Sequence, residues 1–209
     1  EDRAADIAAR YGINAEADWH KDEFYGELKQ SITYFNADIL VLGMAEKSLE
    51  QDMLGNTTTA VIHRLRFPVL AIPYGVRFEG IKTILFAADI LRGVHLDVLE
   101  IVKDVAADFG AEKVEIFHVS DKVKEIEKAG IRESTESMFG EGVNGVRYFY
   151  KNVESNAVIS EIRKEVTAIK ADMLIMVPNR YGFWGSLIHR SKTRIMASGI
   201  EVPLLSLPL

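Results

Sequence analysis

Short apolar runs alternate along the chain with longer stretches in which apolar residues recur three and four positions apart. The runs are rich in β-branched residues and predict strands, whereas the longer stretches predict amphipathic helices. In the last two thirds of the chain the predicted strands are Ile81–Ala87, Lys113–Val119, Val146–Tyr150, Asp172–Val177 and Val202–Leu207. The predicted helices between them cover Leu91–Phe109, a stretch capped by Ser155 or Asn156, and Ile188–Ala197. Such alternation is typical of a parallel sheet covered by helices on both faces.

The first third of the chain continues the same alternation. Its predicted helices are Glu1–Tyr11, Glu23–Phe35 and Thr57–Leu65. Its predicted strands are Asn14–Trp19, Asp38–Leu42 and Phe67–Ile72. Gly12 directly follows the first of these helices and is a typical helix stop.

Two segments of the chain occur twice and in the same order. Ala37–Leu42 recurs as Ala171–Met176 (171 − 37 = 134 positions later), and Phe67–Pro73 recurs as Val202–Pro208 (202 − 67 = 135 positions later). A repeat of this length is a domain, because solenoid units repeat every ~20–50 residues. We therefore predict two tandem copies of one α/β domain, a first copy at 1–76 and a second copy at 77–209.

The repeat also predicts that the first copy is incomplete at its start. The counterpart of the strand Ile81–Ala87 would fall before residue 1 (81 − 134 = −53). We expect about fifty residues of the parent protein to be absent from this sequence.

Composition describes an ordinary globular protein, with 48% apolar and 27% charged residues. The sequence has no cysteine, which excludes disulfides and thiolate chemistry and fits the cytoplasm. The net charge of −6 argues against nucleic acid or an anionic membrane as the main partner. No run without Asp, Glu, Lys or Arg is longer than eleven residues, and the apolar run Phe67–Val76 has ten, about half of what a membrane helix needs.

A glycine-containing turn in the first copy is the strongest candidate for binding chemistry. Gly43 follows the strand Asp38–Leu42, and Gly55 opens the next predicted helix. Such turns suit phosphate, because unpaired amide N–H groups and the helix dipole both favour an anion.

Other signatures of chemistry are absent from the sequence. The five histidines are scattered, which predicts no metal site, and no nucleophile elbow, Walker loop or paired-carboxylate motif occurs. We therefore predict no catalytic residue. We interpret His118, at a strand end, as structural, and we expect Asp38 and Asp172, at two strand starts, to bond to local backbone.

At these residues the chain resembles the universal stress protein (UspA) family over essentially its whole length. The resemblance rests on an Ala-Asp-apolar strand ending in Gly, a Gly that opens a helix, and a Pro-Val-Leu-like last strand that ends in Pro. The strand Ile84–Ala88 with Asp89 is similar to the family's first strand and its terminal Asp. The resemblance implies two tandem Rossmann-like (adenine nucleotide alpha hydrolase-like) domains, each with a five-stranded parallel sheet of order 3-2-1-4-5.

Family members that bind ATP carry the motif Gly-x2-Gly-x9-Gly-Ser/Thr, which the first copy matches imperfectly. Gly43 and Gly55 match the outer glycines, but Glu46 replaces the middle one, and its charge would repel a triphosphate. Asn56 stands where Ser or Thr is expected and is followed by Thr57 and Thr58.

The second copy departs further from the motif. Val177, Arg180 and Arg190 replace the three glycines, although Ser191 is retained. Asp89 is also retained, and the corresponding Asp contacts adenine in nucleotide-binding members. The residues that the resemblance implies for ATP or AMP are thus Gly43, Gly55, Asn56, Thr57, Thr58, Asp89 and Ser191. The bulky Phe183 and Trp184 nearby predict either a filled pocket, an interface or a local apolar cluster.

Together these features indicate a stress-response binding or regulatory protein with degenerate nucleotide sites, and not an enzyme. The first alternative is an ATP or AMP sensor that acts through the glycine turn of the first copy; a second is a weak hydrolase or transferase. We expect an internal pseudo-dimer in which the last strands, Phe67–Ile72 and Val202–Leu207, meet. A homodimer and an unidentified protein partner are further expectations.

Overall fold

The computed structural model describes residues 2–19, 23–44, 54–88, 96–121, 145–177 and 201–208. The chain forms two compact units, an N-terminal unit (Glu1–Ala37) and a sheet unit (Asp38–Leu209). The predicted helix Ile188–Ala197 lies outside the described residues, as do the loops that contain Glu46 and Trp184.

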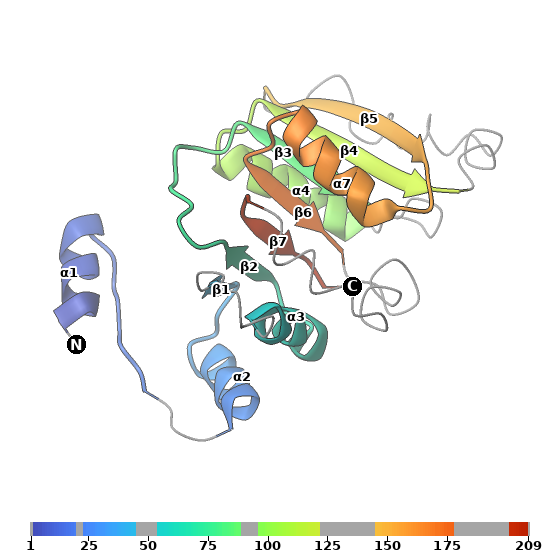
Figure 1. Ribbon diagram of the computed structural model, residues 1–209. Coiled ribbons are helices and arrows are strands. Elements are labelled where there is room, and N and C mark those ends of the chain that lie inside the picture. Colours follow the sequence, from blue (N-terminus) through green and yellow to red (C-terminus); the bar gives the residue numbers. More distant parts are fainter. Residues whose placement is uncertain are drawn as a thin grey trace. The chain divides into compact units, whose positions relative to one another are not determined.

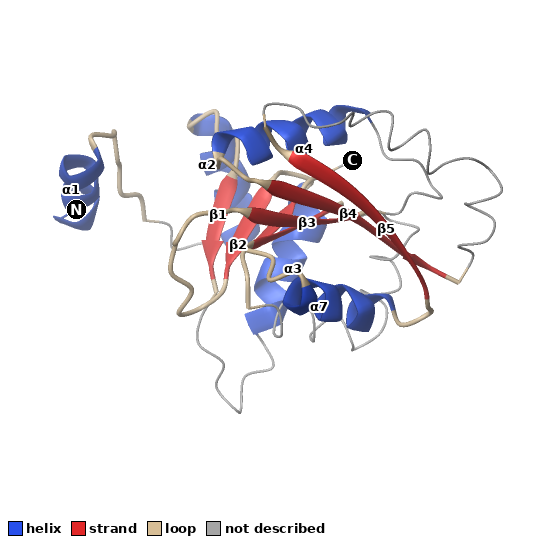
Figure 2. Ribbon diagram, turned by 90° about the horizontal axis from the view of Figure 1, so that it is seen from above, coloured by secondary structure: helices blue, strands red, loops and turns tan. Residues whose placement is uncertain are grey.

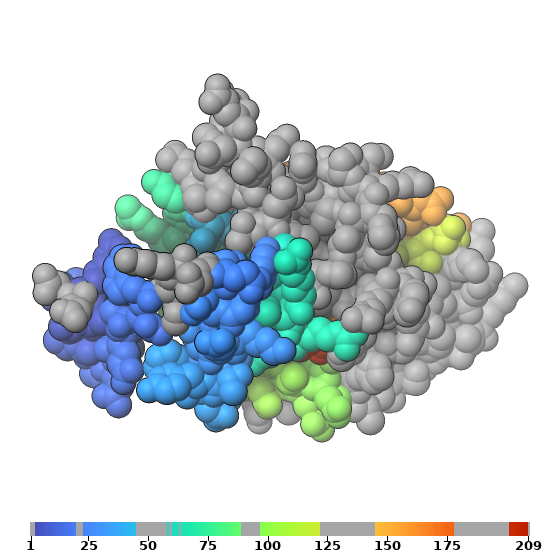
Figure 3. Space-filling view, turned by 90° about the horizontal axis from the view of Figure 1, so that it is seen from below, coloured from blue at the N-terminus to red at the C-terminus, as the bar shows by residue number. Residues whose placement is uncertain are grey.

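The N-terminal unit, drawn in blue in Figure 3, contains the helices α1 (Asp2–Tyr11) and α2 (Phe24–Tyr34). Both confirm the sequence-based predictions. Gly12 follows α1 with φ +64°, in the left-handed region that favours glycine. The predicted strand at Asn14–Trp19 is wrong, because this segment pairs with no strand among the described residues. An apolar, extended sequence becomes a strand only when a neighbour takes up its backbone hydrogen bonds.

The sheet unit contains seven described strands and three described helices (Figure 1). The strands are β1 (Leu40–Gly43), β2 (Val69–Ile72), β3 (Thr83–Ala87), β4 (Lys113–Ser120), β5 (Arg147–Glu154), β6 (Met173–Met176) and β7 (Leu204–Ser206). The helices are α3 (Leu54–Leu65), α4 (Leu96–Asp108) and α7 (Val158–Ala168).

The strands form one continuous sheet of order β1-β2-β7-β6-β3-β4-β5. Strands β3 to β7 all run parallel, and in order along the second copy they give the predicted arrangement 3-2-1-4-5. The first copy contributes the parallel pair β1 and β2. The described strands therefore form a single seven-stranded sheet, to which the second copy contributes five strands and the first copy two. The domain boundary after residue 76 stays a prediction.

The last strands of the two copies pair directly, as the sequence predicted. β2 runs antiparallel to β7, with Leu70 opposite Leu205 at the centre of the pairing. This is the one antiparallel contact among the described strands.

The helices α4 and α7 cover opposite faces of the sheet (Figure 2). Alternate residues of β3 show why: Ile84 and Phe86 pack in the cluster that contains α4 residues such as Val102. Leu85 packs in the second cluster, which contains Ile162 of α7. Because successive strand residues point to opposite faces, an apolar run such as Ile84–Ala87 is suited to burial on both sides.

Several element boundaries differ from the prediction. α7 begins at Val158 with Ala157 as its N-cap, so neither Ser155 nor Asn156 caps it; the Ser155 hydroxyl accepts the Ala157 N–H at 3.0 Å instead. β5 extends to Glu154 because it follows β4 residue by residue as far as Ser120. α3 begins at Leu54, three residues earlier than predicted.

The C-terminal ends of α2 and α7 share the same backbone features. α2 and α7 are the same length, and each is followed by a non-glycine residue in the left-handed region, Asn36 (φ +47°) and Lys170 (φ +51°). The Ala37 N–H donates to the Ile32 carbonyl at 3.0 Å, and the Ala171 N–H donates to the Val166 carbonyl at 2.9 Å. The two copies thus end this helix in the same way before entering β1 and β6.

Asp172 does not bond to local backbone, contrary to the prediction. Its carboxylate accepts the N–H groups of Lys82 at 2.9 Å and Thr83 at 2.8 Å, at the start of the neighbouring strand β3. The Asp172 N–H also donates to the Thr83 carbonyl at 2.8 Å. Asp172 therefore fixes where β3 begins beside β6, a long-range contact that local sequence does not reveal.

We expect Ile175→Ala in β6 to lower the free energy of unfolding by about 2–5 kcal/mol, because its side chain is fully buried. Val41→Ala, at the equivalent position of β1, trims a side chain that is 57% exposed and should cost less than about 1 kcal/mol. Equilibrium urea unfolding of both variants measures the difference. Equal losses would contradict the exposed edge position of β1.

Candidate functional site

The predicted site residues follow, in the sequence, strands that end at opposite edges of the sheet. In open parallel sheets, ligands bind beyond the carboxyl ends of the strands. β1 and β2 run antiparallel to all the other strands, so Gly43 at the end of β1 lies at one edge, and the ends of β3 and β6 lie at the other. Gly43 and the end of β3, which precedes Asp89 in the sequence, therefore lie at opposite edges of the sheet.

The first group is built around the end of β1 and the start of α3. The helix α3 begins at Leu54, so Gly55, Asn56 and Thr57 lie within its first turn and do not precede the helix. The first four N–H groups of a helix have no partner within the helix, which is the arrangement that favours an anion. Thr58 is in the same turn but is buried, with 7% of its surface exposed.

Gly43 is exposed, and the packing around it does not require a glycine at this position. A side chain added there would meet no heavy atom within 4 Å, and its backbone is outside the left-handed region. A glycine at this place leaves the backbone open to close approach by another molecule.

The second group surrounds the point where strand order reverses, between β3 and β6. Ala87 and Met176, the last residues of these strands, are register partners. Ala88 and Val177 come next, while the predicted site residues Asp89 and Ser191 lie outside the described residues. Val177 is half-buried and packs against the apolar cluster on the α4 face.

His118 holds the backbone directly before Asp89. Its side chain is buried, and its Nδ1 lies 2.9 Å from the Ala88 carbonyl oxygen. Because a carbonyl oxygen can only accept, Nδ1 is the donor and carries the proton. The Ala88 N–H in turn donates to the Phe117 carbonyl at 3.0 Å, so β3 and β4 stay joined beyond the last paired residue of β3. The structural role predicted for His118 is confirmed.

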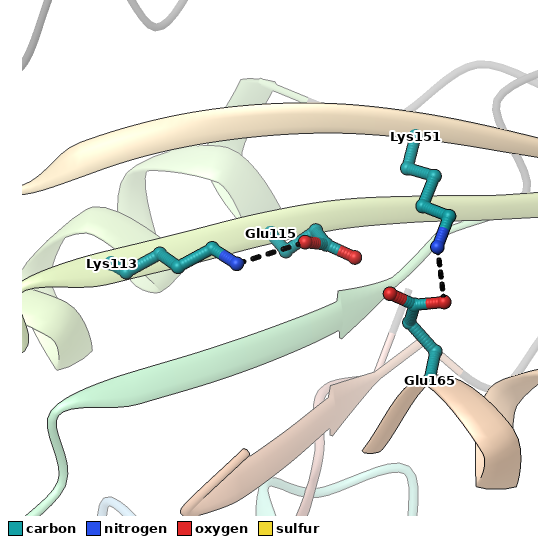
Figure 4. A network of polar contacts seen from close by, with 4 residues as sticks. All are labelled: Lys113, Glu115, Lys151 and Glu165. Atoms are coloured by element: carbon teal, nitrogen blue, oxygen red, sulfur yellow. Dashed lines mark hydrogen bonds and ion pairs between the residues drawn. The ribbon is translucent and has the colours of Figure 1, made fainter. Parts of the chain in front are cut away.

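A buried polar network lies under α7 and was not predicted from the sequence (Figure 4). Glu115 of β4 and Glu165 of α7 are both buried. Lys113 Nζ donates to Glu115 Oε2 at 3.1 Å, and Lys151 Nζ donates to Glu165 Oε2 at 2.6 Å. Figure 4 shows the two carboxyl groups turned toward each other between the two lysines. The sequence signal is a Glu at an inward position of the apolar strand Val114–Val119.

The electrostatics of this network are dominated by burial. Burial raises the pKa of Glu115; the hydrogen bond from Lys113 acts in the opposite direction, and the neighbouring Glu165 adds to the rise. Glu115 Oε1 is buried without a hydrogen-bond partner among the described residues when both carboxyls are ionised. A proton on one of the two would satisfy it. The network lies in the middle of β4, away from the carboxyl edge, and belongs to the packing of α7.

Two classes of site find no support in the described part of the chain. No three His, Cys, Asp or Glu side chains gather there in a way that would hold a metal ion. No described helix has the length and apolar character needed to span a membrane.

No protein-family model and no curated protein matches the chain. Solved structures share its fold. A universal stress protein from Archaeoglobus fulgidus DSM 4304 is 21% identical with a TM-score of 0.70, over 99% of this chain and 73% of that one. A functionally unknown protein from Pseudomonas aeruginosa PAO1 is 16% identical with a TM-score of 0.70, over 99% and 76%. The cytoplasmic domain of a prokaryotic cation chloride cotransporter is 9% identical with a TM-score of 0.53, over 98% and 76%. The chain therefore has the fold of a universal stress protein.

We expect the stability of the chain to fall with rising pH through the titration of Glu115. The stabilisation present while its carboxyl is protonated is complete below the ordinary Glu pKa of about 4.3 and is lost as the pH rises through the raised pKa. Glu115→Gln cannot ionise, so it should gain stability relative to wild type as the pH rises above about 4.3, by about 1.4 kcal/mol for each pH unit by which the folded-state pKa of Glu115 exceeds its ordinary value. Urea unfolding across this pH range measures the gain.

Glu112→Gln is the matched control, because it removes one negative charge from a side chain that is 62% exposed. A stability difference between Glu115→Gln and wild type that stays constant across the pH range would contradict the assignment.

Proposed function

We propose that this chain is a universal stress protein that acts by binding or regulation and whose nucleotide sites are degenerate. The fold and the strand order β5-β4-β3-β6-β7 support the family assignment. The sequence adds the Ala-Asp-apolar strand ending in Gly and the strand that ends in Asp89.

The observation that carries the degeneracy is the difference between Gly43 and Val177, which are equivalent in the sequence repeat and lie at the ends of β1 and β6. Gly43 is exposed and leaves open space at its Cβ position. Val177 directly follows β6 and has a branched side chain that packs against the apolar cluster on the α4 face. Because a phosphate cradle needs backbone N–H groups that a ligand can approach closely, the second copy is unsuited to a nucleotide.

The first copy keeps a feature that favours the alternative, an ATP or AMP sensor. The first turn of α3 offers the amides of Gly55, Asn56 and Thr57, and α3 connects two parallel strands, so its N-terminus faces the edge where β1 ends. Against this alternative stands Glu46, whose charge opposes a triphosphate.

The remaining functional assignments are also proposals. The direct pairing of β2 with β7 supports an internal pseudo-dimer of the two copies. The absence of cysteine supports the cytoplasm. We propose binding rather than catalysis and an unidentified protein partner, with a weak hydrolase or transferase activity as the remaining alternative.

We expect no saturable rise in melting temperature when the chain is titrated with Mg-ATP or with AMP to millimolar concentration. A ligand present at a hundred times its Kd would stabilise the fold by about 2.7 kcal/mol, which a thermal-shift measurement detects readily. Gly55→Arg, titrated in parallel, places a bulky side chain in the first turn of α3.

A saturable rise in wild type that Gly55→Arg abolishes would overturn the degenerate-site proposal and establish the sensor function in the first copy. A rise that Gly55→Arg leaves unchanged would place a nucleotide elsewhere and would contradict both readings of this site.

A further inference from the structure

Glu115 and Glu165 are the two acidic residues that are buried in the described part of the chain, and they belong to different layers of the fold. Glu115 is on β4, on the same face as Phe117, which packs in the apolar cluster on the α7 side. Glu165 is on α7 itself. Their side chains are 8% and 9% exposed. A bond between the two carboxyl groups therefore ties the helix to the sheet.

Each carboxyl group has one oxygen that is occupied by a lysine. Lys113 Nζ donates to Glu115 Oε2, and Lys151 Nζ donates to Glu165 Oε2. Glu115 Oε1 is buried and has no hydrogen-bond partner among the described residues. The two carboxyl groups are turned toward each other (Figure 4), and Glu165 is within side-chain hydrogen-bonding reach of Glu115. Ionised carboxylates only accept, so without a proton the two groups face each other unbonded.

The surroundings of the pair favour a proton on Glu115. Burial has the largest effect and raises the pKa of Glu115, and Glu165 adds to the rise, while Lys113 acts in the opposite direction. Glu165 accepts a short, charge-assisted bond from the Lys151 ammonium group at 2.6 Å. A proton on Glu115 Oε1 gives this buried oxygen a partner and leaves both lysine bonds in place.

The strands beside Glu115 offer no further charged group that bonds to it. β3, which pairs with β4 on one side, has no titratable side chain over Thr83–Ala87. On the other side, β5 contributes Lys151, which bonds to Glu165, and Arg147, which is exposed.

The other charged residues of α7 are also turned to different partners or sides. Glu161 and Lys164 bond to each other at 2.9 Å. Arg163 is two positions before Glu165, and side chains at this spacing on a helix do not face each other. Lys113, Lys151 and Glu165 are therefore the charged groups of the site around Glu115.

We propose that Glu115 is protonated in the folded protein and donates a hydrogen bond to Glu165, and that this bond is a pH-sensitive latch that holds α7 against the sheet. When Glu115 ionises, the bond is lost and two buried carboxylates repel each other. Local opening of α7 relieves the repulsion, because both groups then reach water. The opening uncovers Leu85 and Phe117, which are fully buried in the cluster on the α7 side. The latch involves neither nucleotide site and goes beyond the proposed function.

The direction of the pH effect follows from the two states of α7. In the open state Glu115 is in water and has the ordinary Glu pKa of about 4.3. In the closed state its pKa is raised, so the stabilisation of the closed state is complete below about pH 4.3 and is lost as the pH rises through the raised pKa. Between these two values each opening releases one proton, and the open fraction rises by up to about ten-fold per pH unit.

Hydrogen-exchange mass spectrometry across this pH range tests the latch. After correction for the intrinsic pH dependence of exchange, the protection of α7 should fall by up to about ten-fold per pH unit and then level off. The protection of α4 should stay constant, because α4 covers the opposite face of the sheet and its acidic residues are exposed.

Glu115→Gln has an amide N–H that can donate to Glu165 and that is not lost at any of these pH values, so α7 should stay protected throughout. Glu112→Gln removes a negative charge from a side chain that is 62% exposed and should keep the pH dependence of wild type. Wild-type protection of α4 in both variants shows that the fold is intact.

The proton itself is measured on the wild-type chain by ¹³C NMR of the glutamate carboxyl carbons. The Glu115 signal is the one that is missing from Glu115→Gln, and we expect it to titrate above the ordinary value of about 4.3.

Three results would overturn the proposal. They are a Glu115 signal that titrates at or below about pH 4.3, an equal loss of protection in α4 and α7, and a pH dependence of α7 that persists in Glu115→Gln. None of these readouts involves a nucleotide, so the outcome is independent of the thermal-shift titration.

Discussion

The antiparallel pairing of β2 with β7 is the contact on which the arrangement of both candidate sites depends. It joins the last strands of the two copies into one sheet, so neither strand presents an unpaired edge that would attract other chains. It also reverses the strand direction at the centre of the sheet. The carboxyl ends of β1 and β3 therefore lie at opposite edges of the sheet.

Much of this arrangement could be predicted from the sequence, because strand order and pairing follow from apolar runs and their repetition. The repeat of Ala37–Leu42 as Ala171–Met176 predicted two equivalent strands, and both formed. What could not be predicted are contacts between residues far apart in the chain. The Asp172 carboxylate accepts a backbone N–H group of β3, and Glu115 lies close to Glu165 of α7. Both contacts exist only because the fold brings distant segments together. The strand predicted at Asn14–Trp19 did not form for the same reason, because a strand needs a neighbouring strand to take up its backbone hydrogen bonds.

The Glu115 network shows why a buried charged group is weak support for a functional site. Two buried carboxyls between two lysines have a large desolvation cost, and removing one partner leaves the other uncompensated. Yet the network lies in the middle of β4, where Lys113 Nζ also lies 5.1 Å from the centre of the Phe149 ring. Its position, and not its chemistry, assigns it to the contact between α7 and the sheet.

The strands β1 and β6 have similar sequences but differ in how far they are buried. β1 and β6 share an Ala-Asp-apolar pattern, and a continuous apolar run is typical of a parallel strand buried on both faces. β6 is buried in this way, and β1 is not, although both have the same neighbour on one side. The exposure of β1 is therefore set by its surroundings and not by its sequence. In the second copy β3 provides the backbone N–H groups that the Asp172 carboxylate accepts.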